Sequence, residues 1–318
     1  MKRTISEMLM AAVLVWLVPW FLVSVVISAK PQEVAPQNTE PSETSRPEQR
    51  ISVKLGDEIT EMKLEDYLTA VLLAELPGSF HMEAKMAQAV VARTYALRTV
   101  AETDKHHGAV CGDSSCCQGY RSPADYINSG GIQAVVDQAR MAVQQTEGLV
   151  LTYKGSLIDA TYFACSGGYT EPAVAVWGTE VPYLQAVPSP GEENAAHYTD
   201  TVTMTPSEFA RALERELTGN PGGWFGPVTY TQGGGVAWMT IGGVRYSGKD
   251  LRTMLNLRST AFTVTATDTR IQIITRGYGH RVGMSQYGAQ AMALEGSAWR
   301  QILVHYYPGT EIMQVLEN

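Results

Sequence analysis

Hydrophobic and polar positions divide the chain into parts, and the first is a long apolar run. Met8–Ala29 holds 22 residues without a charged side chain, and Lys2 and Arg3 precede it. As a helix this run would span roughly 33 Å, at about 1.5 Å per residue, which is enough to cross a bilayer core. The positive flank predicts a cytoplasmic tail over 1–7, an anchor over 8–29 and an extracytoplasmic remainder. A cleavable signal peptide is the alternative, because Val-Ile-Ser-Ala at the end of the run resembles a cleavage site.

The segment 30–50 is polar and contains almost no apolar residues. Four prolines punctuate it, at Pro31, Pro36, Pro41 and Pro47. A segment of this composition cannot bury enough surface to offset the entropy of ordering it, and its prolines keep it extended. We therefore predict a linker over 30–50 and a folded domain over 51–318.

Helical periodicity begins soon after the linker. Residues 64–76 predict a helix that ends before Pro77-Gly78. Residues 81–102 predict a longer helix, with apolar residues at helical spacing (Met82, Met86, Val90, Leu97 and Val100). Three further ranges predict helices: 132–146, 284–294 and 298–306. A middle section with a different pattern lies after the helix at 132–146 and before the helices at 284–294 and 298–306.

This middle section combines short strands with two helix starts. Thr205-Pro206-Ser207-Glu208 is a capping box, and its helix has the apolar stripe Phe209, Leu213 and Leu217. A second short helix is predicted from Ser247. Strands are predicted here over 228–231, 236–241, 244–246, 262–266 and 271–275, and elsewhere over 51–55, 58–62, 149–153 and 157–163, the last two as a hairpin. We expect an α+β fold of helices and antiparallel sheets, in which the middle section forms an inserted second lobe.

Composition and charge exclude one class of partner. The chain is 45% hydrophobic and 18% charged, with a net charge of −8. This is the composition of an ordinary folded protein, and the sequence contains no basic block. We therefore expect no nucleic-acid partner.

Glu75 is the most informative candidate for chemistry. It is the one ionisable residue in Ala-Val-Leu-Leu-Ala-Glu-Leu-Pro-Gly, residues 70–78. Burial among apolar neighbours would raise its pKa, and a protonated carboxylic acid can donate a proton to a glycosidic oxygen. The alternative is a surface glutamate at the end of a helix.

Other polar candidates lie on the long helix and on two glycine-rich turns. On the helix, Gln88 is a candidate for binding a sugar amide or hydroxyl, and Arg93 for binding a substrate carboxylate or forming a structural ion pair. The loop 277–289 is rich in glycine and carries His280, Ser285 and Gln286. Ser166 lies on a similar turn beside Cys165, which would pair with His280 in a less supported thiol mechanism.

Nitrogen and sulfur donors cluster at His106, His107, Cys111, Cys116 and Cys117. Such a set suits a structural Zn²⁺, although two adjacent cysteines are poorly spaced for two ideal tetrahedral ligands. A Cys111–Cys117 disulfide and free thiols are the alternatives, the disulfide because the domain is expected outside the membrane.

Five motifs in a fixed order resemble the stage II sporulation protein D family. They are Glu75-Leu-Pro77, Ala87-Gln-Ala-Val-Val-Ala-Arg-Thr-Tyr-Ala96, Cys117-Gln-Gly-Tyr120, Ser166-Gly-Gly168 and Gly279-His-Arg-Val-Gly-Met-Ser-Gln-Tyr-Gly-Ala289. The resemblance covers roughly residues 51–318. It departs from the family pattern at two positions: Cys116 stands where relatives often have His, and Arg281 stands where they have the middle glycine of the loop.

The resemblance implies a lytic transglycosylase that acts on peptidoglycan strands after removal of their stem peptides, with Glu75 as the catalytic residue. It also implies action at the mother-cell membrane during engulfment, on the side that faces the intermembrane space, together with stage II sporulation proteins P and M. Some family members hold zinc, and the matching ligands here are Cys111, Cys117 and His107 or His106. The zinc would be structural, and the chemistry would require no cofactor.

The expected reaction needs one acid–base residue, because the 6-hydroxyl of the substrate itself is the nucleophile and gives a 1,6-anhydro product. Gln88, Ser166, His280, Ser285 and Gln286 would position the glycan. One alternative is a peptidoglycan-binding scaffold that recruits a separate hydrolase. Another is a zinc hydrolase of wall peptides with Glu75 as base.

Overall fold

The computed structural model describes residues 48–102 and 105–315. The predicted cytoplasmic tail, the anchor and nearly all of the linker lie outside these residues. The first strand begins at Arg50, the last residue of the predicted linker. Within the described residues, no helix combines the length and the apolar character needed to cross a bilayer.

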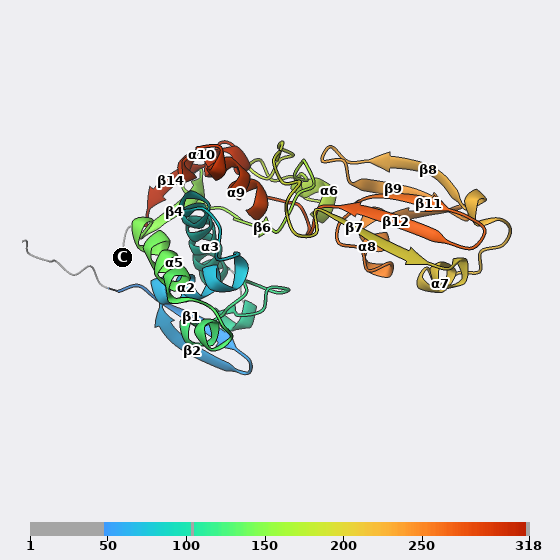
Figure 1. The fold of residues 1–318 in the computed structure, drawn as a ribbon. Coiled ribbons are helices and arrows are strands. Elements are labelled where there is room, and N and C mark those ends of the chain that lie inside the picture. Colours follow the sequence, from blue (N-terminus) through green and yellow to red (C-terminus); the bar gives the residue numbers. More distant parts are fainter. Residues whose placement is uncertain (1–47, 103–104, 316–318) are drawn as a thin grey trace, which may run out of the picture. The chain divides into compact units, whose positions relative to one another are not determined.

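A bundle of helices forms the larger of two hydrophobic cores. Its members are α2 (Leu64–Glu75), α3 (Met82–Glu102), α5 (Gln133–Gln145), α9 (Gln286–Leu294) and α10 (Trp299–Tyr306). Helix α3 packs against all four of the others, so it occupies the middle of the bundle (Figure 1). The short helix α4 (Pro123–Asn128) begins at the side-chain cap Ser122.

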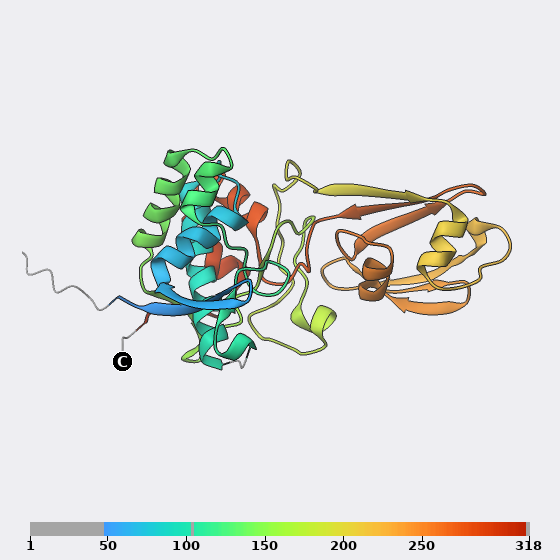
Figure 2. The ribbon, with the colours of Figure 1, turned by 90° about the horizontal axis from the view of Figure 1, so that it is seen from below.

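Three small sheets border this bundle. The first has the order β2 (Glu58–Lys63), β1 (Arg50–Leu55), β3 (Val110–Cys111), and the second β14 (Glu311–Gln314), β4 (Leu149–Tyr153), β5 (Ser156–Leu157). The third pairs β6 (Tyr162–Phe163) with β13 (Met284–Ser285). The pairs β1–β3 and β6–β13 are parallel, and the other pairs are antiparallel. Segments far apart in sequence, such as β6 and β13 or β4 and β14, thus pair beside the helices (Figure 2).

A second hydrophobic core is built from the residues between β6 and β13. It has two antiparallel sheets, in the orders β10 (Val244–Ser247), β9 (Val236–Ile241), β8 (Phe225–Tyr230) and β11 (Ala261–Ala266), β12 (Ile271–Arg276), β7 (Thr199–Met204). Helices α7 (Pro206–Ala212) and α8 (Gly248–Met254) and the turn η2 (Pro221–Gly223) accompany them. Phe209, Leu251 and Ile271 are fully buried in this core. The fold is therefore mixed α+β, with helices and predominantly antiparallel sheets, and its second core lies within the sequence of the first.

Local signals predicted the helix starts well. The capping box at Thr205 is formed, with the Glu208 amide donating to Thr205 and the Thr205 amide donating to Glu208. The helix is shorter than its apolar stripe suggests, since Leu213 is already its C-cap residue.

Two predicted elements near the glycine-rich loop were wrong in part. The expected hairpin strand 157–163 breaks into β5, which pairs with β4, and β6, which pairs with β13. Residues 284 and 285 are a strand rather than the first turn of a helix, because they are the partners of β6. Helix α9 begins at Gln286, two residues later than predicted, with Ser285 as its side-chain cap.

Candidate functional site

A pocket of about 1280 Å³ opens beside the C-terminal end of α2. Its lining comes from α2, α3, most of the segment 112–121, the segment 161–164 that contains β6, the helix α8, the loop 278–280 and the start of α9. The lining side chains with polar groups include Glu75, Tyr95, Asp113, Arg121, Tyr162, Arg252, Tyr278, His280 and Gln286. The structure therefore brings together three of the residues predicted for catalysis or glycan binding, namely Glu75, His280 and Gln286, and the predicted metal ligand Cys117 also lines the pocket.

Glu75 is the last residue of α2 and is partly buried at the pocket wall. Its Oε1 accepts a hydrogen bond from the backbone amide of Gly119 at 2.6 Å. Its Oε2 has one longer contact, 3.4 Å from Nε2 of Gln286. A Cβ at Gly119 would lie 2.9 Å from Oε1, so glycine is needed for this close approach. One carboxyl oxygen is thus fixed by the backbone, and the other is the freer one for exchanging a proton.

His280 is held in its neutral form in the same pocket. Burial, with the nearby charge of Arg252, lowers its pKa to about 4. Its Nδ1 accepts a hydrogen bond from the Val282 amide at 3.1 Å, and its ring contacts the rings of Phe163 and Trp177. At neutral pH His280 therefore offers an uncharged hydrogen-bonding group and an aromatic wall.

The two predicted serines bind a buried carboxylate and do not face the pocket. Ser166 and Ser285 are both fully buried, and the hydroxyl of each donates to the carboxylate of Glu192, at 2.8 Å for Ser166 and 2.5 Å for Ser285. Glu192 is itself buried and also accepts hydrogen bonds from Ser189 and from the amide of Gly167. Neither serine lines the pocket. Their predicted role as glycan contacts is replaced by one in fixing the turns that flank the pocket.

Gln88 and Arg93 are also buried away from the pocket. They lie on the part of α3 that is covered on every side, and both have 0% exposure. Arg93 Nη2 forms an ion pair with Glu65 at 2.6 Å, and Nη1 donates to the carbonyl of Thr146 at 2.7 Å. Of the two roles that the sequence left open for Arg93, the structure therefore shows the structural ion pair and not a side chain placed to bind substrate in the pocket. The amide of Gln88 has no hydrogen-bond partner among the described residues.

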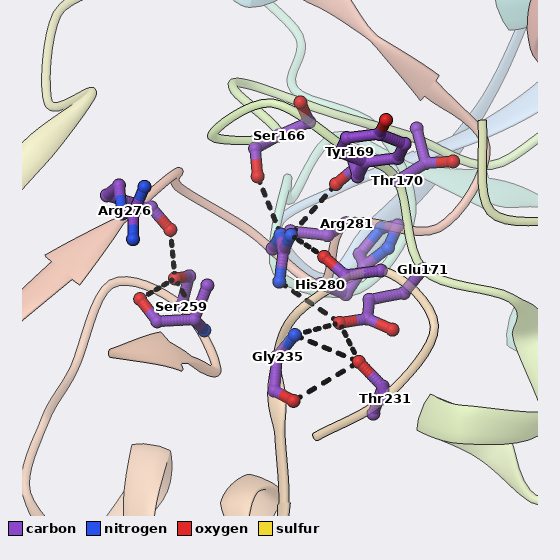
Figure 3. Close-up of polar contacts among 12 residues, drawn as sticks. Ser166, Tyr169, Thr170, Glu171, Thr231, Gly235, Ser259, Arg276, His280 and Arg281 are labelled. Atoms are coloured by element: carbon purple, nitrogen blue, oxygen red, sulfur yellow. Dashed lines mark hydrogen bonds and ion pairs between the residues drawn. The ribbon is translucent and has the colours of Figure 1, made fainter. Parts of the chain in front are cut away.

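Arg281, the departure from the family pattern, is buried in a polar network (Figure 3). Its Nη1 lies 3.0 Å from Glu171 Oε1, and its other nitrogens donate to the carbonyls of Ser166, Tyr169 and Gly233. Glu171 also accepts hydrogen bonds from Thr231 and Gly235 of the β8–β9 loop. Arg281 therefore joins the turn 166–171 to a loop of the second core, and its charge does not face the pocket.

A nitrogen and sulfur cluster adjoins the pocket. The ligand atoms of His106, Cys111, Cys116 and Cys117 all lie within 4.8 Å of one another. Four donors at about 2.3 Å from a tetrahedral ion lie about 3.8 Å apart, so the set fits Zn²⁺. The structure brings His106 into the cluster, whereas the predicted ligand His107 is exposed.

Adjacent cysteines are accommodated in this cluster by a tight turn. The amides of Cys116 and Cys117 both donate to the carbonyl of Asp113, at 3.0 and 2.8 Å. Both thiols therefore reach the same cluster, despite a spacing that looked too cramped in the sequence.

Cys165 lacks the properties of a nucleophile. Burial, together with the carboxylate of Glu192, raises the pKa of its thiol to about 12. The thiol donates to Glu192 at 3.3 Å. The thiol mechanism therefore has no support in the structure.

Sequence reasoning missed several pocket residues. Arg252 comes from the second core, and Tyr162 has a buried hydroxyl without a hydrogen-bond partner among the described residues. Gln118, next in sequence to the lining residues Cys117 and Gly119, does not itself line the pocket; it is fully buried, and its Oε1 accepts a hydrogen bond from Tyr67 at 3.0 Å. The sequence signal that could have identified Gln118 is its position in the family motif Cys117-Gln-Gly-Tyr120. Arg252 lies in none of the five motifs, so the sequence offered no signal for it.

Together these features define an α+β protein with one partly buried carboxyl group held at a polar pocket, a site suited to acid–base chemistry. The chain belongs to the stage II sporulation protein D family, a family of sporulation proteins. A family model described as Stage II sporulation protein matches residues 54–153. Stage II sporulation protein D of Bacillus subtilis (strain 168) is 35% identical over 294 residues, in an alignment that covers 91% of this chain and 84% of that protein.

Further relatives extend the comparison. Stage II sporulation protein D of Bacillus amyloliquefaciens is 36% identical over 262 residues, covering 80% of this chain and 76% of that protein. The amidase enhancer of Bacillus subtilis (strain 168) is 30% identical over 304 residues, covering 77% of this chain and 40% of that protein. The similarity to the sporulation proteins therefore extends well beyond the region matched by the family model.

Proposed function

We propose that this protein is a peptidoglycan lytic transglycosylase that cleaves the bond between N-acetylmuramic acid and N-acetylglucosamine in peptide-stripped strands. The observation that carries the proposal is the position of Glu75. Its carboxyl group is fixed at Oε1 by Gly119 and lies in a pocket lined by His280 and Gln286. The family membership supports the assignment of this carboxyl group as the acid.

The reaction begins with proton transfer from the Glu75 carboxyl to the bridging oxygen. The bond from this oxygen to the anomeric carbon of the muramic sugar then breaks, and the oxygen leaves as a hydroxyl of the glucosamine. Positive charge develops on the anomeric carbon. The Glu75 carboxylate takes the proton of the muramic 6-hydroxyl, whose oxygen bonds to the anomeric carbon and closes the 1,6-anhydro ring. Glu75 ends protonated, so one residue serves as acid and then as base.

Asp113 is the other carboxylate among the described lining residues, and its environment differs from that of Glu75. It is exposed, and hydrogen bonds from Ser115 lower its pKa. Glycoside hydrolases use two carboxyl groups, one of which activates water or attacks the sugar. In the proposed reaction the 6-hydroxyl takes that role, so Asp113 has no chemical step.

Product analysis tests this assignment. Residues 48–318 should release fragments that end in 1,6-anhydromuramic acid from peptide-stripped glycan strands, because an internal hydroxyl attacks. Mass spectrometry separates these ends from reducing ends, which are heavier by one water. Reducing ends would mean that water is the nucleophile and that the protein is a hydrolase.

A non-catalytic role is the second candidate. In it the protein binds peptidoglycan and recruits or assists a separate hydrolase. The similarity to a protein named amidase enhancer favours this candidate. Binding of stripped strands without release of any fragment would support it over the enzyme.

The neighbouring cluster is proposed as a structural zinc site held by His106, Cys111, Cys116 and Cys117. Four protein donors fill a tetrahedral shell, whereas a catalytic zinc keeps one position open. The ion would stabilise the segment that carries Gly119, and the acid–base steps require none of its chemistry. The same argument opposes a zinc hydrolase of wall peptides.

Metal content distinguishes the ligand set. His106→Ala should lower bound zinc, measured by elemental analysis, from about one ion per chain towards zero and lower the melting temperature. His107→Ala is the matched control, because both histidines have positive φ, 51° and 59°. Equal zinc content in the two variants would contradict the assignment. If thiol titration of the wild type shows a disulfide in place of metal, the site is not a zinc site.

The cellular context is also proposed. The apolar run 8–29 would anchor the protein in the mother-cell membrane, with the folded domain facing the intermembrane space. The partners would be glycan strands and, by family resemblance, stage II sporulation proteins P and M. The acidic net charge of −8 argues against a nucleic-acid partner.

A further inference from the structure

One cation in the pocket is unexplained by the acid–base chemistry. Arg252 lies on α8 in the second core (Figure 1), yet its side chain lines the same pocket as Glu75 and His280. It is partly buried, and its charge is felt at His280, whose pKa it helps to lower. The second core therefore contributes a positive group to a pocket that is otherwise built by the first.

The terminal nitrogens of this guanidinium group have no partner within residues 48–102 and 105–315. Among the hydrogen bonds of the described residues, Arg252 makes one, from Nε to the carbonyl of Leu257 at 3.4 Å. Neither of its terminal nitrogens bonds to another described residue, and it forms no ion pair with one. The other buried or partly buried arginines of the described residues each pair with a carboxylate, namely Arg93, Arg98, Arg258 and Arg281.

The second cation of the pocket lining is already occupied. Arg121 is exposed, donates to the hydroxyl of Ser129 at 2.6 Å and lies over the ring of Tyr126. Arg252 is thus the lining cation whose terminal donors are available to a ligand. Burial removes part of the solvent around this charge and lowers its pKa. A guanidinium in this state binds a carboxylate through two parallel hydrogen bonds.

We propose that Arg252 recognises the free lactyl carboxylate of peptide-stripped muramic acid. This inference rests on the proposed function, because it names the group by which that site selects its substrate. Muramic acid carries a lactyl ether whose carboxyl group forms an amide with the stem peptide. Removal of the peptide turns that neutral amide into an anion. Arg252 therefore distinguishes stripped strands from strands that retain their peptides, by charge as well as by bulk.

A matched pair of substrates tests the charge alone. Peptide-stripped strands are compared with the same strands after their lactyl carboxylates have been coupled to methylamine, which removes the charge and adds little volume. The wild type should cleave the free acid with a kcat/KM about tenfold or more above that for the methylamide, because a charge-assisted hydrogen bond is lost. Arg252→Gln should lose this preference, mainly because its kcat/KM for the free-acid strands falls. Arg252→Lys should retain part of the preference.

Binding gives a readout that does not depend on turnover. In a Glu75→Gln background, Arg252→Gln should weaken calorimetric binding of the free-acid strands and leave binding of the methylamide strands unchanged. Arg245→Gln is the control from the same core, since Arg245 stacks on Trp238 and does not line the pocket. It should behave as the parent protein does with both substrates.

The outcomes separate the two proposals. If the wild type cleaves both substrates equally, or if Arg252→Gln keeps the full preference for the acid, Arg252 is not the recognition group and the enzyme assignment stands. If the wild type cleaves neither substrate, the proposed function fails. Preference for the acid that survives in Arg252→Gln but disappears in Arg121→Gln would assign the recognition to Arg121.

Discussion

Replacing Glu75 with Gln should lower the rate at which anhydro ends appear by about 10²–10⁴-fold, the usual contribution of general acid–base catalysis. The amide keeps the shape of the side chain, and its oxygen can still accept the Gly119 hydrogen bond of 2.6 Å. What it cannot do is give a proton to the leaving oxygen or take one from the 6-hydroxyl. The measurement is the initial rate of fragment release from peptide-stripped strands.

Asp113→Asn is the matched control for this loss. Asp113 lines the same pocket, but its carboxylate is exposed and is bonded within its own turn to Ser115. Its variant should retain activity within a few-fold of the wild type, and both variants should keep the wild-type melting temperature. A large loss in Asp113→Asn together with retained activity in Glu75→Gln would transfer the catalytic role to Asp113.

Glu171→Ala should reduce the free energy of unfolding by about 3–5 kcal/mol, the usual cost of removing one partner of a buried ion pair. The side chains of Arg281 and Glu171 are only 2% and 1% exposed. The substitution leaves the Arg281 charge buried without its carboxylate, and it also removes the acceptor for Thr231 and Gly235. Urea denaturation followed by circular dichroism measures the change.

Two further variants calibrate this effect. Glu171→Gln retains an acceptor and removes the charge, so it should lie between the wild type and Glu171→Ala. Glu102→Ala breaks the ion pair between Arg98 and Glu102, whose side chains are 31% and 44% exposed. This substitution should lower the free energy of unfolding by less than about 1 kcal/mol. Equal costs for Glu171→Ala and Glu102→Ala would mean that the buried pair contributes no more than a surface pair.

Local features were predictable where they depend on neighbours in the chain. The break at Pro77-Gly78 ends α2 next to Glu75, and the capping box at Thr205 starts α7, because both signals act within a few residues. The strand 157–163 was not predictable in its true form. Its second half pairs with Met284 and Ser285, and local periodicity holds no information on a partner so distant in sequence.

For the site, the sequence by itself determined that Glu75 is a solitary carboxyl at the end of a helix and that a glycine-rich loop with His280 follows far along the chain. Tertiary structure decided that these two meet in one pocket, and that Arg93, Ser166 and Ser285 instead bind carboxylates away from the pocket. It also placed His106, and not its neighbour His107, beside the three cysteines of the nitrogen and sulfur cluster. The physical reason is that residue type fixes what a side chain can donate or accept, whereas only the packing of distant segments fixes which group receives it and whether solvent or substrate can still reach it.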